Sequence, residues 1–209
     1  MNIGLFGGTF DPPHSGHLIV AQDAALALSL DRVLFMPAAQ PPHKLGRAMT
    51  PAAVRARMLQ LAIEGNPLFA CSSLELEREG PSYTVETLKQ LTAQQPEARW
   101  TLLLGADQYA EFALWRQPGE IRRLARIAVL ARGGGSDGTA ATAAAVIAPV
   151  EPLEQGDVRV HVTRIDISAT QIRARVAAGQ PIRYMVPAAV ESFIFEHGLY
   201  SRNGSAVTG

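Results

Sequence analysis

His14 and His17 are the residues whose type and spacing most directly suggest chemistry in this sequence. They lie three positions apart, separated by Ser15 and Gly16, at the start of a stretch rich in good helix formers. Imidazoles at this spacing project from one face of the first turn of a helix. That turn also carries unpaired N–H groups and about half a positive charge, which suits a phosphate. The pair therefore predicts a cradle for negative charge, with no acid or nucleophile beside it.

A short apolar run precedes the histidines and must position them. Ile3–Phe6 predicts a buried strand that ends in two glycines, and residues 15–29 predict a helix. Ligands of open α/β sheets bind beyond the carboxyl ends of the strands, and glycine lets a backbone approach a ligand closely. The residues of this turn expected to contact a ligand are Gly7, Gly8, Thr9 and Phe10. For either histidine taken alone, a surface position on a loop that caps the helix remains the alternative.

The rest of the chain alternates between apolar runs and helical patterns. Further strands are predicted at Arg32–Pro37, Phe69–Leu76, Trp100–Leu104, Ile127–Ala131 and Val158–Ile165. Helices are predicted at Pro51–Glu64 with Thr50 as the N-cap, at Thr84–Gln95, from Gln108, and twice after the last strand. This alternation implies right-handed crossovers and a parallel sheet covered on both faces. The fold class is therefore α/β, a single doubly wound and mostly parallel sheet with a small C-terminal helical segment.

Composition excludes several classes of protein. Lysine plus arginine number 19 and aspartate plus glutamate 19, so the net charge is zero, which argues against a nucleic-acid partner. Cys71 is the single cysteine, which excludes an intrachain disulfide and a cysteine zinc cluster. The start MNIGLFGGTF has no basic region, and no apolar run reaches about 18 residues. We expect a cytoplasmic chain with no membrane partner, and the sequence leaves open whether it forms a homo-oligomer.

Two glycine-rich or terminal stretches are expected to lie outside the regular fold. We interpret Gly133–Ala145 as a loop or irregular insertion, and residues 201–209 as a flexible tail beyond a single domain of residues 1–200. Gly133–Gly138 matches G-x-G-x-x-G, with Asp157 about twenty residues on. Three consecutive glycines match such a pattern easily by chance, and Pro149 and Pro152 soon interrupt any helix, so we do not interpret it as a dinucleotide site.

With these elements in place, the segment GGTFDPPHSGH resembles the HxGH nucleotidylyltransferases, whose signature matches residues 14–17. The whole segment of residues 7–17, longer than the signature itself, is similar to the nicotinate-nucleotide adenylyltransferase branch of that family. Pro41-Pro42-His43-Lys44 is similar to the PPHK segment of that family, and the resemblance implies that Lys44 approaches nucleotide phosphates. Alone, Lys44 would be interpreted as a solvated loop lysine.

Three later segments extend the resemblance to about residues 1–200. Gly105-Ala106-Asp107 resembles the GxD segment, which implies contacts to a nucleotide, although Asp107 could equally cap the helix from Gln108. Tyr83, Thr84 and Trp115 match positions that the family uses against a pyridine ring and its carboxylate. Ile167-Ser168-Ala169-Thr170-Gln171-Ile172-Arg173 is similar to ISSTxIR, with alanine in place of the second serine. This match implies phosphate contacts from Ile167, Ser168, Thr170 and Arg173, while Ser168 or Thr170 alone could be a helix cap.

The resemblance implies adenylyl transfer from ATP to nicotinate mononucleotide in NAD biosynthesis, by direct in-line displacement, on a Rossmann-like fold. His14, His17, Lys44 and Arg173 would be catalytic, and Mg²⁺ would be held mainly by ATP phosphates and water. Thr84, N–H groups near Trp115 and Arg132 could distinguish a carboxylate from an amide. The alternatives are a sister enzyme with another acceptor, such as nicotinamide mononucleotide or phosphopantetheine, and a non-catalytic nucleotide sensor.

Overall fold

The computed structural model describes residues 1–41, 49–132, 147–148, 153–154 and 156–201. Their strands form one sheet of order β3-β2-β1-β4-β5-β7-β6, in which β6 alone runs antiparallel to its neighbour. The strands are β1 (Asn2–Gly8), β2 (Arg32–Pro37), β3 (Phe69–Cys71), β4 (Arg99–Gly105), β5 (Ala125–Arg132), β6 (Ile147–Ala148) and β7 (Val158–Val162). The doubly wound, mostly parallel sheet expected from the sequence is confirmed.

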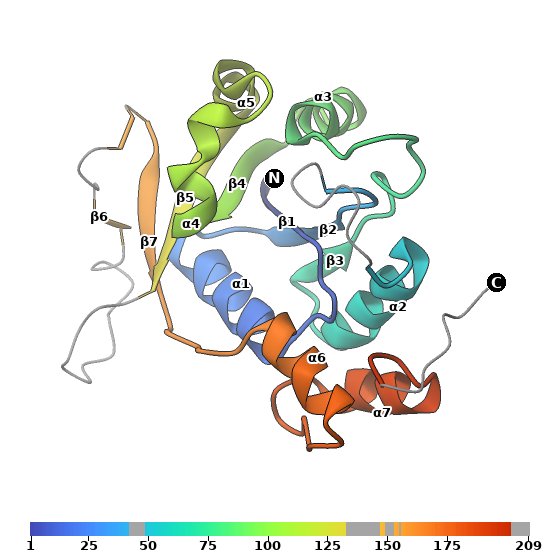
Figure 1. The fold of residues 1–209 in the computed structure, drawn as a ribbon. Helices are drawn as coiled ribbons and strands as arrows, with labels where there is room; N and C mark the ends of the chain where they lie inside the picture. Colours follow the sequence, from blue (N-terminus) through green and yellow to red (C-terminus); the bar gives the residue numbers. More distant parts are fainter. Residues whose placement is uncertain (42–48, 133–146, 149–152, 155, 202–209) are drawn as a thin grey trace.

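Helices cover both faces of this sheet (Figure 1). They are α1 (Ser15–Ala27), α2 (Ala52–Ile63), α3 (Thr84–Gln94), α4 (Ala106–Ala110), η2 (Phe112–Leu114), α5 (Pro118–Leu124), α6 (Ala169–Ala177) and α7 (Ala188–Glu196). Successive residues of a strand face opposite sides, and β1 shows this directly. Its Leu5 packs with the α3 and α5 residues, whereas Phe6 packs with those of α1 and α2.

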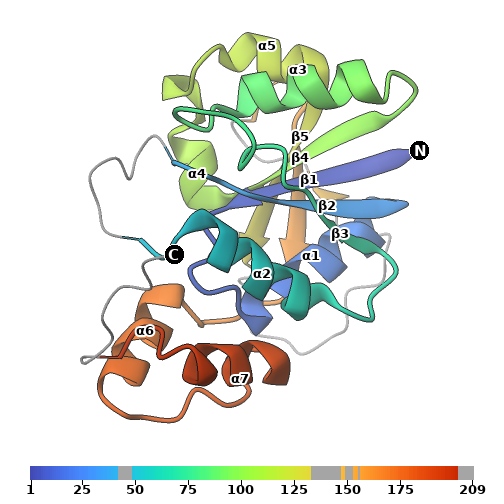
Figure 2. The same cartoon turned by 90° about the vertical axis from the view of Figure 1, so that its right-hand side faces the viewer.

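A third apolar cluster attaches the C-terminal helices. Met58 and Ala62 of α2 pack against Ile172 of α6 and against Val190 and Ile194 of α7. Figure 2 shows α6 and α7 together at one end of the molecule, away from α3 and α5. This is the small helical segment that the sequence predicts. None of the helices in the described ranges is both long and apolar enough to cross a membrane.

Several predicted boundaries are wrong. β3 ends at Cys71, not Leu76, because Leu74 N–H donates to Ser72 Oγ and the chain turns. β7 ends at Val162, not Ile165. Pro51, not Thr50, occupies the N-cap of α2, since its carbonyl accepts the Arg55 N–H. The sequence reading also missed η2 and α5, which are too short to show a periodic apolar pattern.

Two of the predicted irregular stretches fall outside the described residues: 133–145 and almost all of the tail, 202–209. Inside the described part, the strand order reverses between β1 and β4, which lie side by side in the middle of the sheet. In open α/β sheets this reversal opens a crevice at the carboxyl ends of the strands. The turn after β1 and the start of α4 after β4 both lie at that edge (Figure 2).

Candidate active site

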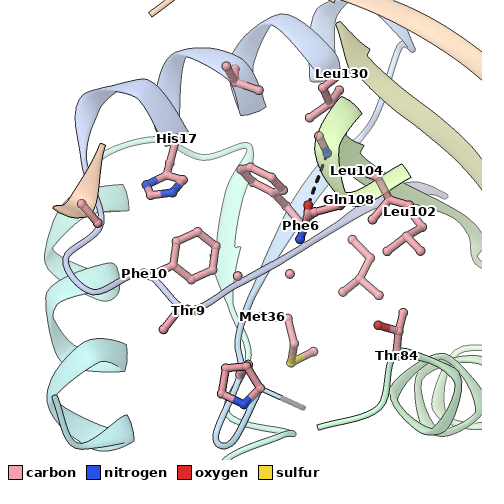
Figure 3. Close-up of a pocket in the computed structure, with 18 of the residues that line it drawn as sticks. Phe6, Thr9, Phe10, His17, Met36, Thr84, Leu102, Leu104, Gln108 and Leu130 are labelled. Atoms are coloured by element: carbon pink, nitrogen blue, oxygen red, sulfur yellow. Dashed lines mark hydrogen bonds between the residues drawn. The ribbon is translucent and has the colours of Figure 1, made fainter. Parts of the chain in front are cut away.

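A cavity of about 650 Å³ lies at this edge of the sheet. Its wall is formed by the turn after β1, the start of α1, the end of β4, the first residues of α3, the loop around Trp115 and the start of α6. Figure 3 shows His17 and Thr84 on opposite sides of the cavity, with Phe10, Thr9 and Met36 between them. The cavity therefore has a histidine end and an α3 end.

The turn after β1 is shaped by a buried arginine and an aromatic cluster. Arg55 of α2, 1% exposed, donates to the Thr9 carbonyl at 2.6 Å. Phe10 takes a positive φ of 50° and packs against His17, with ring centroids 5.0 Å apart. A Cβ on Gly8 would lie 2.9 Å from Phe10 Cζ, so only glycine fits there without moving that ring. The turn is thus a rigid part of the core that ends at the histidines.

His14 and His17 lie as their spacing predicts, on one face at the start of α1. His14 is the N-cap residue, and the two rings stack with centroids 3.7 Å apart and planes inclined by 26°. The His14 N–H donates to His17 Nδ1 at 3.2 Å. Because that nitrogen is an acceptor, a neutral His17 carries its proton on Nε2. Burial, helped by the neighbouring His14, lowers the pKa of His17 well below its usual value.

The two residues between the histidines have their own structural roles. A Cβ on Gly16 would lie 3.1 Å from His14 Nδ1 and 3.3 Å from Ile165 Cγ2, so glycine leaves room for the ring. The Ser15 N–H donates to the Met185 carbonyl at 2.9 Å, and Ser15 Oγ donates to the Tyr184 carbonyl at 3.1 Å. Ser15 therefore ties the start of α1 to the segment between α6 and α7.

The start of α6 closes the histidine end of the cavity. Ser168 is the N-cap and accepts the Gln171 N–H at 3.1 Å, so the capping role considered for it is confirmed. Arg173 Nη1 donates to the Asp11 carbonyl at 2.6 Å, and its Nη2 donates to Thr170 Oγ1 at 3.2 Å. Ile167, Ser168, Ala169, Thr170 and Arg173 all line the cavity. Ala169, the departure from the family motif, faces it without a hydroxyl.

The end of β4 differs from the sequence-based expectation. Gly105 lines the cavity, but it is also the N-cap of α4, so the prediction that Asp107 caps a helix from Gln108 is wrong. Asp107 lies in the first turn of α4, is exposed, and is not among the described residues of the cavity wall. Gln108, which sequence reasoning missed, lines the cavity and accepts the Gly105 N–H at 3.3 Å (Figure 3).

Tyr83 and Thr84, at the start of α3, and Trp115, after η2, line the far end. Trp115 packs against Phe112 with centroids 5.4 Å apart. Sequence reasoning missed Arg116 here, although its position next to Trp115 was a signal. Glu75 was missed because its segment was expected to be a strand. The Glu75 side chain is buried in the cavity wall and accepts Thr87 Oγ1–H at 2.6 Å, and burial raises its pKa.

Two expected site residues cannot be placed. Lys44 lies outside the described residues, and Pro41, the last described residue before it, lines the cavity. Arg132 ends β5, with its side chain outside the description. In the part of the chain that the structure describes, no group of three or more His, Cys, Asp or Glu side chains is arranged to hold a metal ion. The nearest carboxylate to the histidines in sequence, Asp11, accepts Tyr200 Oη–H at 2.6 Å and the Thr50 N–H at 3.3 Å.

This chain is similar in sequence and in fold to known proteins. Residues 5–175 match the cytidylyltransferase-like family. A probable nicotinate-nucleotide adenylyltransferase of Thermomicrobium roseum is 46% identical over 95% of this chain and 91% of its own. A second, from Geobacillus thermodenitrificans, is 42% identical over 97% and 88%. The fold is similar to that of a Plasmodium falciparum nicotinic acid mononucleotide adenylyltransferase complexed with NaAD, with a TM-score of 0.73, 16% identity and coverage of 95% and 97%.

The match to the family model spans both the histidine turn and the start of α6, and the relatives match nearly the whole chain. Both ends of the cavity thus lie inside the region of similarity. The chain belongs to the cytidylyltransferase-like family and, within it, to the nicotinate-nucleotide adenylyltransferases.

Proposed function

We infer that this chain is a nicotinate-nucleotide adenylyltransferase of NAD biosynthesis, which transfers the adenylyl group of ATP to nicotinate mononucleotide. The observation that carries this inference is the stacked His14–His17 pair at the N-terminus of α1, at the end of a cavity where the strand order reverses. Relatives 42–46% identical over nearly the whole chain carry the same activity in their names. The products are nicotinate adenine dinucleotide and pyrophosphate.

The reaction is an in-line displacement at the α-phosphorus of ATP. A phosphate oxygen of the mononucleotide forms the new bond to this phosphorus, and the bond to the oxygen that bridges to the β-phosphate breaks. The attacking phosphate is already ionised at neutral pH, so it requires no general base. Positioning and charge stabilisation then supply the rate enhancement. This matches a site whose polar groups at the histidine end are donors rather than bases.

The roles follow from where the donors lie. His17 donates from Nε2, and together with His14 it contacts the α- and β-phosphates. Arg173, held across the turn by the Asp11 carbonyl, and Lys44 contact the remaining phosphates. The adenosine lies along Gly7, Gly8, Thr9, Gly105 and the Ile167–Thr170 segment, with Asp107 near the ribose. The roles of His14, His17, Arg173 and the residues along the adenosine are supported by their position in the cavity wall, whereas those of Lys44 and Asp107 rest on the resemblance alone.

The acceptor occupies the α3 end. Trp115 offers an aromatic face to the pyridine ring, and Tyr83 and Thr84 offer donors at the first turn of α3. ATP enters as its magnesium complex, with the ion held by phosphate oxygens and water. Both carboxylate oxygens of Asp11 already accept hydrogen bonds. This is consistent with an ion that arrives with ATP and is not held by Asp11. Bound there, Mg²⁺ supplies charge neutralisation on the phosphates.

Pyrophosphate release tests this function against a panel of acceptors. Nicotinate mononucleotide should exceed its amide by roughly 10² to 10⁴ in kcat/KM, because two donors left unmet by the amide cost about 1–3 kcal/mol each. Phosphopantetheine should give no release. Equal rates with the acid and the amide would contradict acid selectivity but leave adenylyl transfer intact. No release with any acceptor would favour the nucleotide sensor.

A further inference from the structure

Arg116 places a cation at the α3 end of the cavity. It follows Trp115 in the loop between η2 and α5, and it lines the cavity wall. Its guanidinium carbon lies 4.8 Å from the centroid of the Tyr83 ring. Among the described residues, no carboxylate forms an ion pair with it, whereas Arg122 and Arg123 of the following helix are both paired. Its charge is therefore available to a ligand.

The contact with the Tyr83 ring positions the guanidinium, and no hydrogen bond to another described residue engages its N–H donors. A guanidinium that lies over an aromatic face keeps its N–H donors in the plane of the group, where they can bind a carboxylate in a bidentate manner. Tyr83 is the N-cap residue of α3, and Thr84 is the first residue of that helix. The contact therefore brings the side chain from one wall of the cavity to the other.

A second contact holds the same loop against α3. Lys89 Nζ donates to Gln117 Oε1 at 3.4 Å, and Gln117 takes a left-handed φ of 55° immediately before Pro118. Such a backbone conformation costs energy for a residue other than glycine, and it persists where surrounding contacts impose it. The Arg116 backbone is thus held between Trp115 and a constrained turn, so its side chain is directed by the loop as well as by Tyr83.

The charges around the cavity show why a cation matters at this end. Glu75 and Glu111 both line the cavity, and in their ionised forms they would repel a carboxylate ligand. The other arginine in the described wall, Arg173, donates to Asp11 and Thr170 at the histidine end. Backbone N–H groups at α3 would bind a carboxylate or an amide oxygen, whereas a guanidinium favours the ionised group over the neutral one.

We propose that Arg116, stacked on Tyr83, is a specificity-determining residue that binds the carboxylate of the acceptor ring and selects the acid over its amide. This rests on the proposed function, in which a nicotinate ring lies beside Trp115. From the sequence alone, Arg132 is another candidate for this role, and its side chain lies outside the description. Arg116 lies next to the residue that is expected to stack on the ring, and it is placed in the cavity wall.

The test measures the dissociation constants of nicotinate mononucleotide and nicotinamide mononucleotide by calorimetry, together with kcat and KM in pyrophosphate release. Arg116→Gln should weaken binding of the acid about tenfold. This is the low end of the range expected when a hydrogen bond to a charged group is lost, because Arg116 is exposed. Binding of the amide and the KM for ATP should change less than twofold. Arg116→Lys keeps the charge without the planar group and should give an intermediate loss for the acid.

Arg123→Gln is the matched control, since Arg123 lies on α5 and pairs with Glu120, and it should leave the acid-to-amide ratio unchanged. If Arg116→Gln weakened binding of the acid and the amide equally, Arg116 would only shape the loop, and the proposal would be overturned. It would be overturned as well if neither dissociation constant changed. Because binding is measured without turnover, these outcomes are separate from failure of the proposed function, which would be the absence of pyrophosphate release by the unaltered chain.

Discussion

At the scale of single residues, His17 is a donor whose protonation is set by its surroundings. Its Nδ1 accepts the His14 N–H, and the Phe10 ring packs edge-on against it. Burial opposes the charged form, so a neutral imidazole offers its Nε2–H as a donor. In the proposed mechanism, a neutral donor at this position would stabilise developing negative charge without holding the pyrophosphate product by a strong ion pair. The helix N-terminus supplies positive potential in addition.

The first prediction is that His17→Ala and His14→Ala lower kcat by about 10²–10³ and change the KM for ATP much less. Removing one donor aimed at charge that builds in a transition state typically has this effect. Steady-state pyrophosphate release measures both constants. His161→Ala, on β7 and outside the described cavity wall, is the control and should keep full activity. Unchanged turnover in a folded His17→Ala protein would contradict the assignment.

The second prediction concerns pH. His17 should remain neutral to well below pH 6.5, because burial lowers its pKa in the folded state. An unfolded chain binds a proton near pH 6.5, so this group stabilises the fold above that pH, and the contribution is lost as pH falls toward the folded-state pKa. The Cε1 proton resonance of His17, assigned by comparison with His17→Gln, reports the titration. A midpoint at or above 6.5 would be inconsistent with the buried geometry.

At the scale of elements, the site depends on polar side chains inside the wall that no periodic pattern reveals. Apolar periodicity predicted the long strands and helices, and the string from Gly7 to His17 predicted the histidine end. It could not show that Arg55 of α2 turns inward, because a charged residue on an amphipathic helix is normally assigned to the solvent face. The residues of η2 and α5 were missed because these helices are too short to show an apolar period, and their positions follow from packing on Trp115 and α3.

Arg55 joins three segments that are far apart in sequence. Its Nη1 donates to the Thr9 carbonyl, its Nη2 to the Ala38 and Ala39 carbonyls, and its Nε to the Thr50 carbonyl. From the other side, Ser82 Oγ accepts the Ala39 N–H at 3.1 Å. After β2, the backbone carbonyls thus accept hydrogen bonds from a buried guanidinium, and a backbone N–H donates to a hydroxyl. We call this arrangement a clamp. This clamp holds the cavity wall that leads toward Lys44.

The third prediction is that Arg55→Met lowers the free energy of unfolding by about 3 kcal/mol or more. Four carbonyls lose their donor, and each buried unsatisfied group costs about 1–3 kcal/mol. Urea denaturation measures the change. Arg57→Met is the matched control, because Arg57 is exposed on the same helix and should change stability by no more than about 0.5 kcal/mol. A loss below 1 kcal/mol for Arg55→Met would show that water replaces the guanidinium at those carbonyls.

At the scale of the whole molecule, the turn after β1 is connected to the far end of the chain. Asp11 accepts a hydrogen bond from Tyr200, 189 positions away, and its carbonyl accepts Arg173. Ser15 donates to Tyr184 and Met185. The resemblance of the C-terminal run to the family predicted that these residues belong to the domain. Only the structure shows that they contact the turn after β1 and the start of α1, because sequence separation gives no information on which loops meet.

The fourth prediction is that Tyr200→Phe destabilises the fold by about 2 kcal/mol while preserving the ring packing. The hydroxyl donates to a carboxylate, and hydrogen bonds to charged groups contribute about 1.5–3 kcal/mol. Burial and the neighbouring Asp11 raise the pKa of Tyr200, so it remains a donor at every working pH. For a chain of this size the loss corresponds to a fall in Tm of roughly 4–8 °C.

The Tyr200→Phe change has two expected consequences, a loss of stability and a higher KM for ATP. Thermal denaturation with and without ATP measures the first, and steady-state pyrophosphate release measures the second. The reduced stability should be present in both conditions, and the KM for ATP should rise, because Asp11 also positions Arg173 through its carbonyl. Tyr184→Phe serves as the control, since Tyr184 is 84% exposed and contacts Ser15 through its carbonyl, which the substitution keeps. If Tyr200→Phe and Tyr184→Phe had the same Tm, the hydrogen bond from Tyr200 to Asp11 would contribute nothing measurable to stability, and the prediction would be contradicted.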